Sequence, residues 1–234
     1  MKLLEISGVK CYCFSSDFDV FKIFDYLISN SLGTYSVAIN AEKIIRCHED
    51  PDFLKIVNES FFQVPDGFAA ILFLKKKFGL KSLKIDLPRM ALQYSNLKRL
   101  RLAIVGTNEE NNKLAYNFIE KSFSEINLVG RLNGYNDFQA IVDFLGINQP
   151  QIILLGLGSP KQEIISSKLL GIFPNLIIIN CGGALDILSG SVKRAPVFFQ
   201  KFNLEWLYRL LSQPKRFKRQ VKLFKIIPIY LFNV

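Results

Sequence analysis

The stretch QIILLGLGSPKQE, residues 151–163, carries the clearest structural signal in the sequence. Four consecutive apolar residues, 152–155, are typical of a parallel strand that is buried on both faces. Two glycines, Gly156 and Gly158, then form a tight turn, and helical spacing begins at about residue 161. Ser159 is expected to cap this helix. A strand, a glycine loop and a helix start, in this order, indicate an α/β protein.

The loop between this strand and helix is a candidate ligand site. Ligands of α/β proteins bind outside the carboxyl ends of the strands, and backbone N–H groups at a helix start favour an anion. The loop lacks the three-glycine fingerprint of dinucleotide-binding proteins. Glycines that serve only the geometry of the turn therefore remain an equal alternative.

Strand-like and helix-like segments alternate along the rest of the chain. Residues 1–13 predict a strand or hairpin. Further strands are expected at 35–39, 61–64, 100–105, 126–129 and 176–179, and helices at 20–29, 41–46, 53–60, 68–78, 111–122, 138–145 and 161–170. This rhythm predicts a doubly wound, mostly parallel sheet of the Rossmann-like kind.

Two features at predicted strand ends point to a ligand. Strands end in glycine at Gly106, Gly156 and Gly182, which would suit the sugar and diphosphate of a nucleotide. Asp66, in Pro65-Asp66-Gly67, follows one strand and precedes a helix, so it faces the ligand edge of the sheet. The alternative for Asp66 is an ordinary helix cap that contributes ~1 kcal/mol to stability.

The positive charge is concentrated at the end of the chain. The 234 residues carry a net charge of +10, and after Leu188 ten lysines and arginines stand against one acid, Glu205. Half of the residues are hydrophobic, which excludes a disordered chain. The sequence predicts an α/β domain over 1–195 and a basic amphipathic appendage over 196–234. A basic tail implies an anionic partner, such as lipid headgroups, a phosphorylated ligand or nucleic acid.

Three arginines of the appendage share one helix face. Arg209, Arg216 and Arg219 fall within about 80° if the helical path is continuous. Guanidinium groups on one face suit a diphosphate, and the interleaved apolar residues suit a membrane interface. The alternative is a solvated basic helix whose apolar side packs on the domain.

Other chemistry finds little support in the sequence. Four cysteines show no C-x-x-C pair, which indicates reduced thiols and a cytosolic protein. Asp17-Phe18-Asp19 matches a metal-binding tripeptide of some sugar transferases, but two acids at a helix start are the favoured interpretation. No signal peptide and no membrane-spanning segment are expected. We expect neither a metal nor a cofactor.

Long motifs give the chain a family resemblance. The sequence resembles bacterial glycosyltransferases of the WecG/TagA/CpsF type from about residue 35 to residue 219. The resemblance is strongest in GLGSPKQE (156–163), GGALDILSGSVKRAP (182–196) and LEWLYRLLSQPKRFKR (204–219). It implies inverting, metal-independent transfer from a UDP-sugar to a sugar on undecaprenyl diphosphate during synthesis of surface polysaccharides. We expect N-acetylglucosamine to be this acceptor sugar.

The resemblance also implies roles for residues. Asp66 would be the general base that takes the proton of the acceptor hydroxyl, and Gln162 and Asn40 would line the catalytic pocket. The resemblance also assigns residues to the two substrates. The donor would contact Gly106, Tyr135, Gly158, Gly183, Asp186 and Lys84, and the acceptor diphosphate would contact Arg209, Arg216 and Arg219. Such an enzyme would lie at the inner face of the cell membrane and could form homo-oligomers.

The sequence departs from the family pattern at two positions. Ala38 stands where a threonine is common, and Lys84 stands nearest to a common arginine, with Arg89 as a possible substitute. Both positions fall where donor and acceptor should meet, so a plain hexose is as acceptable a donor as N-acetylmannosamine. Two alternatives stay open: a nucleotide-sugar-binding subunit without catalysis and, with less support, a nucleic-acid-binding module.

Overall fold

The computed structural model describes residues 2–79, 82–196, 198–199, 207–208 and 226. The chain divides into two compact units. Unit 1 holds residues 2–16 and 38–85 with the described residues from 194 onward, and unit 2 holds 17–37 and 86–193. The predicted appendage, 196–234, lies almost entirely outside the described residues, so its boundary and its helices stay predictions.

Unit 1 begins with a hairpin and continues with helices. The hairpin pairs β1 (Lys2–Ile6) with β2 (Val9–Cys13) antiparallel, as the sequence predicts. The remaining elements are α2 (Ala41–Glu49), α3 (Pro51–Glu59), β4 (Phe62–Pro65) and α4 (Gly67–Phe78). Asn58 of α3 accepts from the Lys10 N–H and donates to the Gly8 carbonyl, which holds the hairpin against α3.

The strands after the hairpin form one sheet of six, in the order β4-β3-β8-β7-β5-β6. Their bounds are β3 (Thr34–Ile39), β8 (Ile177–Asn180), β7 (Ile152–Gly156), β5 (Arg101–Gly106) and β6 (Asn127–Leu132). The pairs β3–β8, β8–β7, β7–β5 and β5–β6 are all parallel. Residues 152–155 are fully buried, which confirms the predicted central strand.

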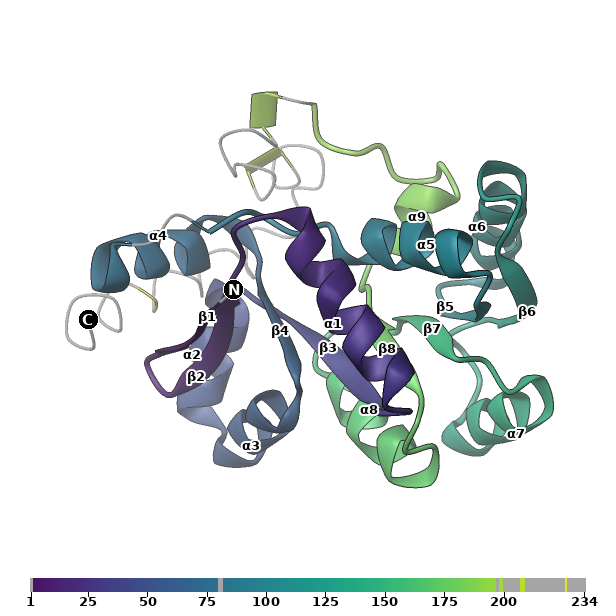
Figure 1. Cartoon of the computed structure of the whole chain (residues 1–234), viewed down its shortest axis with the longest axis horizontal. Coiled ribbons are helices and arrows are strands. Elements are labelled where there is room, and N and C mark those ends of the chain that lie inside the picture. The colour runs from purple at the N-terminus through teal and green to yellow at the C-terminus, as the bar shows by residue number, and fades with distance from the viewer. Residues whose placement is uncertain (1, 80–81, 197, 200–206, 209–225, 227–234) are drawn as a thin grey trace. The chain divides into compact units, whose positions relative to one another are not determined.

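Helices cover both faces of the unit 2 strands (Figure 1). One face carries α1 (Asp17–Ser29), α5 (Leu87–Lys98) and α6 (Glu109–Ser122), and the other carries α7 (Phe138–Asn148) and α8 (Lys161–Ile172). A short helix, α9 (Ala184–Leu188), follows β8. This arrangement confirms the doubly wound, Rossmann-like class.

Four local features differ from the sequence-based expectations. The helices α5 and α9 were not expected, and β6 extends to Leu132. The N-cap of α8 is Pro160, which has no side chain that can cap, so the prediction that Ser159 caps this helix is wrong. Ser159 lies one residue before this N-cap, and the Gln162 N–H in the first turn donates instead to the Gly158 carbonyl over 2.9 Å.

A polar cluster joins α1 to α5 within unit 2. The Tyr94 hydroxyl donates to Asp25 over 2.9 Å, and Lys98 Nζ lies 2.9 Å from the same carboxylate oxygen. These two hydrogen bonds hold the pKa of Asp25 below its ordinary value. The Tyr94 ring also stacks on Phe24, with ring centroids 5.0 Å apart. Aromatic packing and a charged pair therefore fix the two helices together.

Within the described part of the chain, no helix is both long and apolar enough to cross a membrane. All four cysteines are free thiols, as expected.

Candidate active site

Glycines at the carboxyl ends of three unit 2 strands bring their loops close together. A Cβ on Gly106 would lie 2.5 Å from the Gly156 carbonyl oxygen, and one on Gly156 would lie 2.9 Å from the Gly182 carbonyl oxygen. Neither distance is one that a real Cβ adopts. Gly106 and Gly156 are therefore required for the packing of these loops on one another, whatever they bind.

The other two predicted donor glycines are in different situations. Gly158 has φ +76° and open space around it, so its requirement is conformational. Gly183 has an ordinary φ of −83°, and the nearest atom to a Cβ there would be Asp186 Oδ2 at 3.9 Å. Their backbone is thus not crowded by protein atoms, in contrast to that of Gly106.

Thr107, directly after β5, ties these loops together. Its N–H donates to the Gly156 carbonyl over 3.3 Å, and its carbonyl accepts from the Gly134 N–H over 2.7 Å. Its hydroxyl donates to Asp186 Oδ1, and Asn111 Nδ2 donates to the same oxygen over 3.0 Å. The structure thus brings Asp186, on α9, to the end of β5 and the start of α6.

Tyr135 stands on a loop that a separate polar network holds. Its N–H donates to Asn133 Oδ1 over 3.0 Å, and Asn133 Nδ2 donates to Glu109 Oε2 over 2.9 Å. Arg131 forms an ion pair with Glu109 at 2.5 Å. The hydrogen bond from Asn133, and then Arg131, lower the pKa of Glu109. The Tyr135 side chain is 85% exposed, so its ring is available to a ligand.

Gln162 is buried, and both ends of its side-chain amide form hydrogen bonds within unit 2. Only 3% of it is exposed. Its Oε1 accepts from the Gly182 N–H over 3.2 Å, and its Nε2 donates to Glu163 Oε1 over 3.1 Å. The side chain therefore ties the start of α8 to the turn after β8. This geometry is that of a residue that orients the Gly182 turn.

Cys181, beside the same turn, is not set up as a nucleophile. Burial raises the pKa of its thiol to about 12. A thiol is nucleophilic as the thiolate, which is scarce at neutral pH with such a pKa.

Asp66 and Asn40 lie close to each other in unit 1, but their side chains differ in what they do. The Asp66 N–H donates to the carbonyl of Ile39 over 2.8 Å, beside Asn40. Asn40 caps α2, because its Oδ1 accepts from the Lys43 N–H over 3.1 Å. Asp66 occupies the N-cap position of α4 without a side-chain capping bond. The half-buried Asp66 carboxylate is thus not the cap that the alternative interpretation expects.

The remaining predicted residues lie on other segments of the chain. Lys84 is half-buried in the segment before α5, and Arg89 is exposed on α5. Arg209, Arg216 and Arg219 lie outside the described residues. Asp17 and Asp19 occupy the first turn of α1, as the helix-start interpretation predicts. Over the described ranges, no three His, Cys, Asp or Glu side chains gather as metal ligands would.

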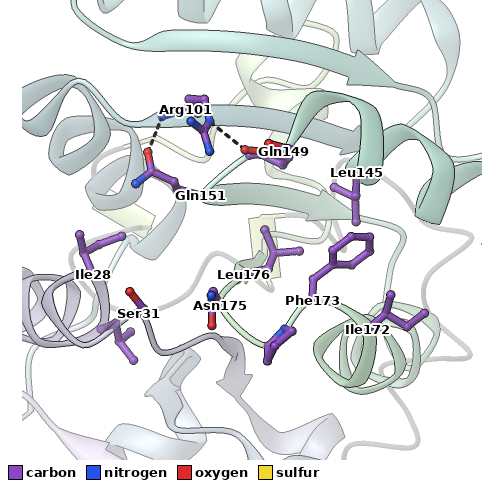
Figure 2. Close-up of a pocket in the computed structure, with 14 residues that line it drawn as sticks. Ile28, Ser31, Arg101, Leu145, Gln149, Gln151, Ile172, Phe173, Asn175 and Leu176 are labelled. Atoms are coloured by element: carbon purple, nitrogen blue, oxygen red, sulfur yellow. Dashed lines mark hydrogen bonds between the residues drawn. The ribbon is translucent and has the colours of Figure 1, made fainter.

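A cavity of about 560 Å³ lies at the opposite edge of the unit 2 strands (Figure 2). Arg101, the first residue of β5, and Gln151, just before β7, line it, and the Arg101 Nε donates to the Gln149 carbonyl over 2.8 Å. Its other walls are largely apolar, from Leu145, Ile172 and Phe173 among others. It shares no residue with the predicted donor site.

The candidate site includes three residues that were not predicted from the sequence: Thr107, Asn111 and Glu109. Asp186 is 79 residues from Thr107 in the chain. No local motif predicts a contact over such a separation in sequence. The polar sequence around 107–112 was a usable signal, because it directly follows a glycine-ended strand.

Comparison with known proteins identifies the family of the chain. The sequence model of the glycosyl transferase WecG/TagA/CpsF family matches residues 4–234. The chain is also similar to the N-acetylglucosaminyldiphosphoundecaprenol N-acetyl-beta-D-mannosaminyltransferase of Bacillus spizizenii. The two are 29% identical over 210 residues, which cover 88% of this chain and 81% of the relative. The family match spans nearly all of the sequence, and the chain accordingly belongs to the WecG/TagA/CpsF family of glycosyltransferases.

Proposed function

We propose that this glycosyltransferase moves a sugar from a UDP-sugar to a hydroxyl of N-acetylglucosamine carried on undecaprenyl diphosphate. The observation that carries the proposal is the Asp66 carboxylate, which sits at the end of β4 without a capping bond. The name of the Bacillus spizizenii relative supports the acceptor, because that enzyme uses N-acetylglucosaminyl-diphosphoundecaprenol. The product would enter the synthesis of a surface polysaccharide.

Asp66 is the general base in this proposal. Its carboxylate takes the proton of the acceptor hydroxyl as that oxygen bonds to the anomeric carbon of the donor. The bond from this carbon to the β-phosphate oxygen breaks at the same time, so UDP leaves and the anomeric configuration inverts. Backbone N–H groups at helix starts and basic side chains stabilise the charge on UDP in place of a metal ion.

The donor nucleoside is assigned to unit 2. Asp186 presents a carboxylate at the end of β5, and the exposed ring of Tyr135 offers a surface on which a base can stack. The acceptor diphosphate is assigned to Arg209, Arg216 and Arg219. Their positive charge also favours the anionic inner face of the cell membrane.

A donor panel tests the proposal. The purified chain is incubated with a short-chain prenyl-diphosphate N-acetylglucosamine and UDP-N-acetylmannosamine, UDP-N-acetylglucosamine, UDP-galactose or UDP-glucose, each with EDTA. We expect disaccharide-lipid from one donor, with an inverted anomeric centre by NMR. Measurable UDP binding without turnover of any donor would instead favour a non-catalytic nucleotide-sugar-binding subunit. Turnover that EDTA abolishes would contradict metal independence.

A further inference from the structure

We propose that Thr107 and Asn111 are positioning residues that orient the Asp186 carboxylate toward the donor nucleoside. This inference rests on the proposed function, in which Asp186 contacts that nucleoside. The two side chains donate to Asp186 Oδ1, from the hydroxyl of Thr107 and from Nδ2 of Asn111. An oxygen that already accepts two hydrogen bonds has little capacity left, so the partner oxygen, Oδ2, is the one that meets a ligand.

The second carboxylate oxygen faces the turn after β8. Among the described residues, Asp186 Oδ2 has no hydrogen-bond donor, and it lies 3.9 Å from the position of a Cβ on Gly183. Asp186 is half-buried, so water or a ligand reaches it. A carboxylate oxygen is an acceptor only. It suits a donor group of the nucleoside: a ribose hydroxyl or the imide N–H of uracil.

The backbone of Thr107 shows that its hydroxyl is held in place at some cost. Its φ is +50°, in the left-handed region that β-branched residues rarely adopt. Five non-glycine residues of the described chain have a positive φ, namely Ser7, Ser31, Arg99, Thr107 and Gln149, and Thr107 is the β-branched one. Glycine or asparagine would fit this backbone better. Neither carries a hydroxyl on a Cβ whose rotation is restricted, as that of threonine is.

The surrounding contacts keep Thr107 in this conformation. Its N–H and its carbonyl bond to Gly156 and Gly134, so the residue is fixed from both sides. Gly134 precedes Tyr135, whose exposed ring is the other element assigned to the nucleoside. Thr107 therefore joins the carboxylate and the aromatic ring of the same proposed subsite, and a change in its side chain should reach the ligand through Asp186.

Calorimetric titration with UDP tests the assignment in the full chain. Thr107→Val keeps the shape and removes the hydroxyl, and we expect it to weaken UDP binding about 10-fold. Thr107→Ser keeps the hydroxyl and should bind within about 3-fold of wild type. Asn111→Ala should weaken binding about as much as Thr107→Val, and it provides an independent probe if the valine variant does not fold. Ser189→Ala is the matched control, because the Ser189 hydroxyl contacts Asp186 at its backbone carbonyl, over 2.8 Å, and not at its carboxylate.

A double-mutant cycle separates positioning from a general structural effect. In an Asp186→Ala background, Thr107→Val should lower the affinity for UDP by less than about 2-fold, because the carboxylate that Thr107 orients is absent. The inference is overturned if Thr107→Val still lowers UDP affinity 10-fold in that background. It is also overturned if Thr107→Val binds UDP like wild type while Asp186→Ala does not. Wild-type protein that fails to bind UDP, or Asp186→Ala that binds it normally, overturns the assignment of the nucleoside itself.

Discussion

Asp66 and Ile39 are joined by one backbone hydrogen bond, in which the Asp66 N–H donates to the Ile39 carbonyl over 2.8 Å. This bond fixes the end of β4 beside the end of β3. The Asp66 side chain adds no capping bond to α4. The backbone at Asp66 is therefore held by this bond, and the carboxylate makes no capping contact with α4.

Removal of the Asp66 side chain should leave stability unchanged. Asp50 is a matched control in the same unit, because its Oδ1 does cap a helix, accepting from the Phe53 N–H over 2.9 Å. We expect Asp50→Ala to cost about 1 kcal/mol. That loss corresponds to a melting temperature lower by roughly 2–4 °C for a chain of this size. Thermal unfolding compares the two variants, and equal destabilisation by Asp66→Ala would show that Asp66 is structural after all.

Glu109 should control the loop that carries Tyr135. Glu109→Gln removes the charge that pairs with Arg131 and weakens the contact with Asn133, so the loop that carries Tyr135 is held less firmly. We expect UDP affinity to fall by about 3- to 10-fold in calorimetric titration. Glu110→Gln, a neighbouring acid in the same first turn of α6, is the control and should bind like wild type. If Glu109→Gln binds UDP as tightly as Glu110→Gln does, Glu109 has no role in the donor site.

The Asp25 cluster predicts a direction for the pH dependence of stability. Hydrogen bonds from Lys98 and Tyr94 lower the pKa of Asp25 from its ordinary value of 3.8. The folded state therefore binds the proton less readily than the unfolded state. The stabilisation is present above pH ~4 and is lost as the pH falls through the lowered folded-state pKa.

Urea unfolding of wild type and Asp25→Asn at pH 7, 4 and 3 checks this sign. We expect wild type to be the more stable at pH 7 and the difference to shrink on acidification, because protonated Asp25 resembles asparagine. A difference that grows at low pH would contradict the cause assigned to the shift.

The tail arginines should act on the acceptor and not on the donor. Replacement of both Arg216 and Arg219 by alanine should raise the KM for the lipid-diphosphate acceptor at least ~10-fold, since charge-assisted bonds to its phosphates are lost. The KM for the UDP-sugar should hardly change. The double variant Lys222→Ala, Lys225→Ala removes the same charge from other positions and is the control. An equal rise in both double variants would indicate general attraction to an anionic surface instead of a defined arginine site.

Much of the fold could be predicted because its signals are local. The buried run 152–155 and the alternation of strands and helices place nearly every element of the sheet. The helix α5 was missed although Leu87, Met90, Ala91 and Tyr94 have helical spacing and are all buried. Pro88 in its first turn is as typical of a turn as of a helix start. The helix α9 has five residues, too few for periodicity to show.

The candidate site was predictable only in part. Asp66 and Asp186 came from motifs, but a motif does not say whether a side chain is already engaged. Gln162 is an example, since burial and two hydrogen bonds give it a role in the protein's own architecture. Thr107 reaches Asp186 from 79 residues away through a left-handed backbone that no sequence pattern announces. Such contacts depend on tertiary packing and cannot be read locally.

The most direct test of the account compares wild type with Asp66→Asn in the transfer of sugar from the active UDP-sugar to the lipid-diphosphate acceptor. Asparagine keeps the size of the side chain and removes the base. If Asp66 is the general base, we expect kcat to fall at least ~100-fold while UDP binding and melting temperature stay at wild-type values. Wild-type turnover by Asp66→Asn would contradict it and remove Asp66 from the reaction.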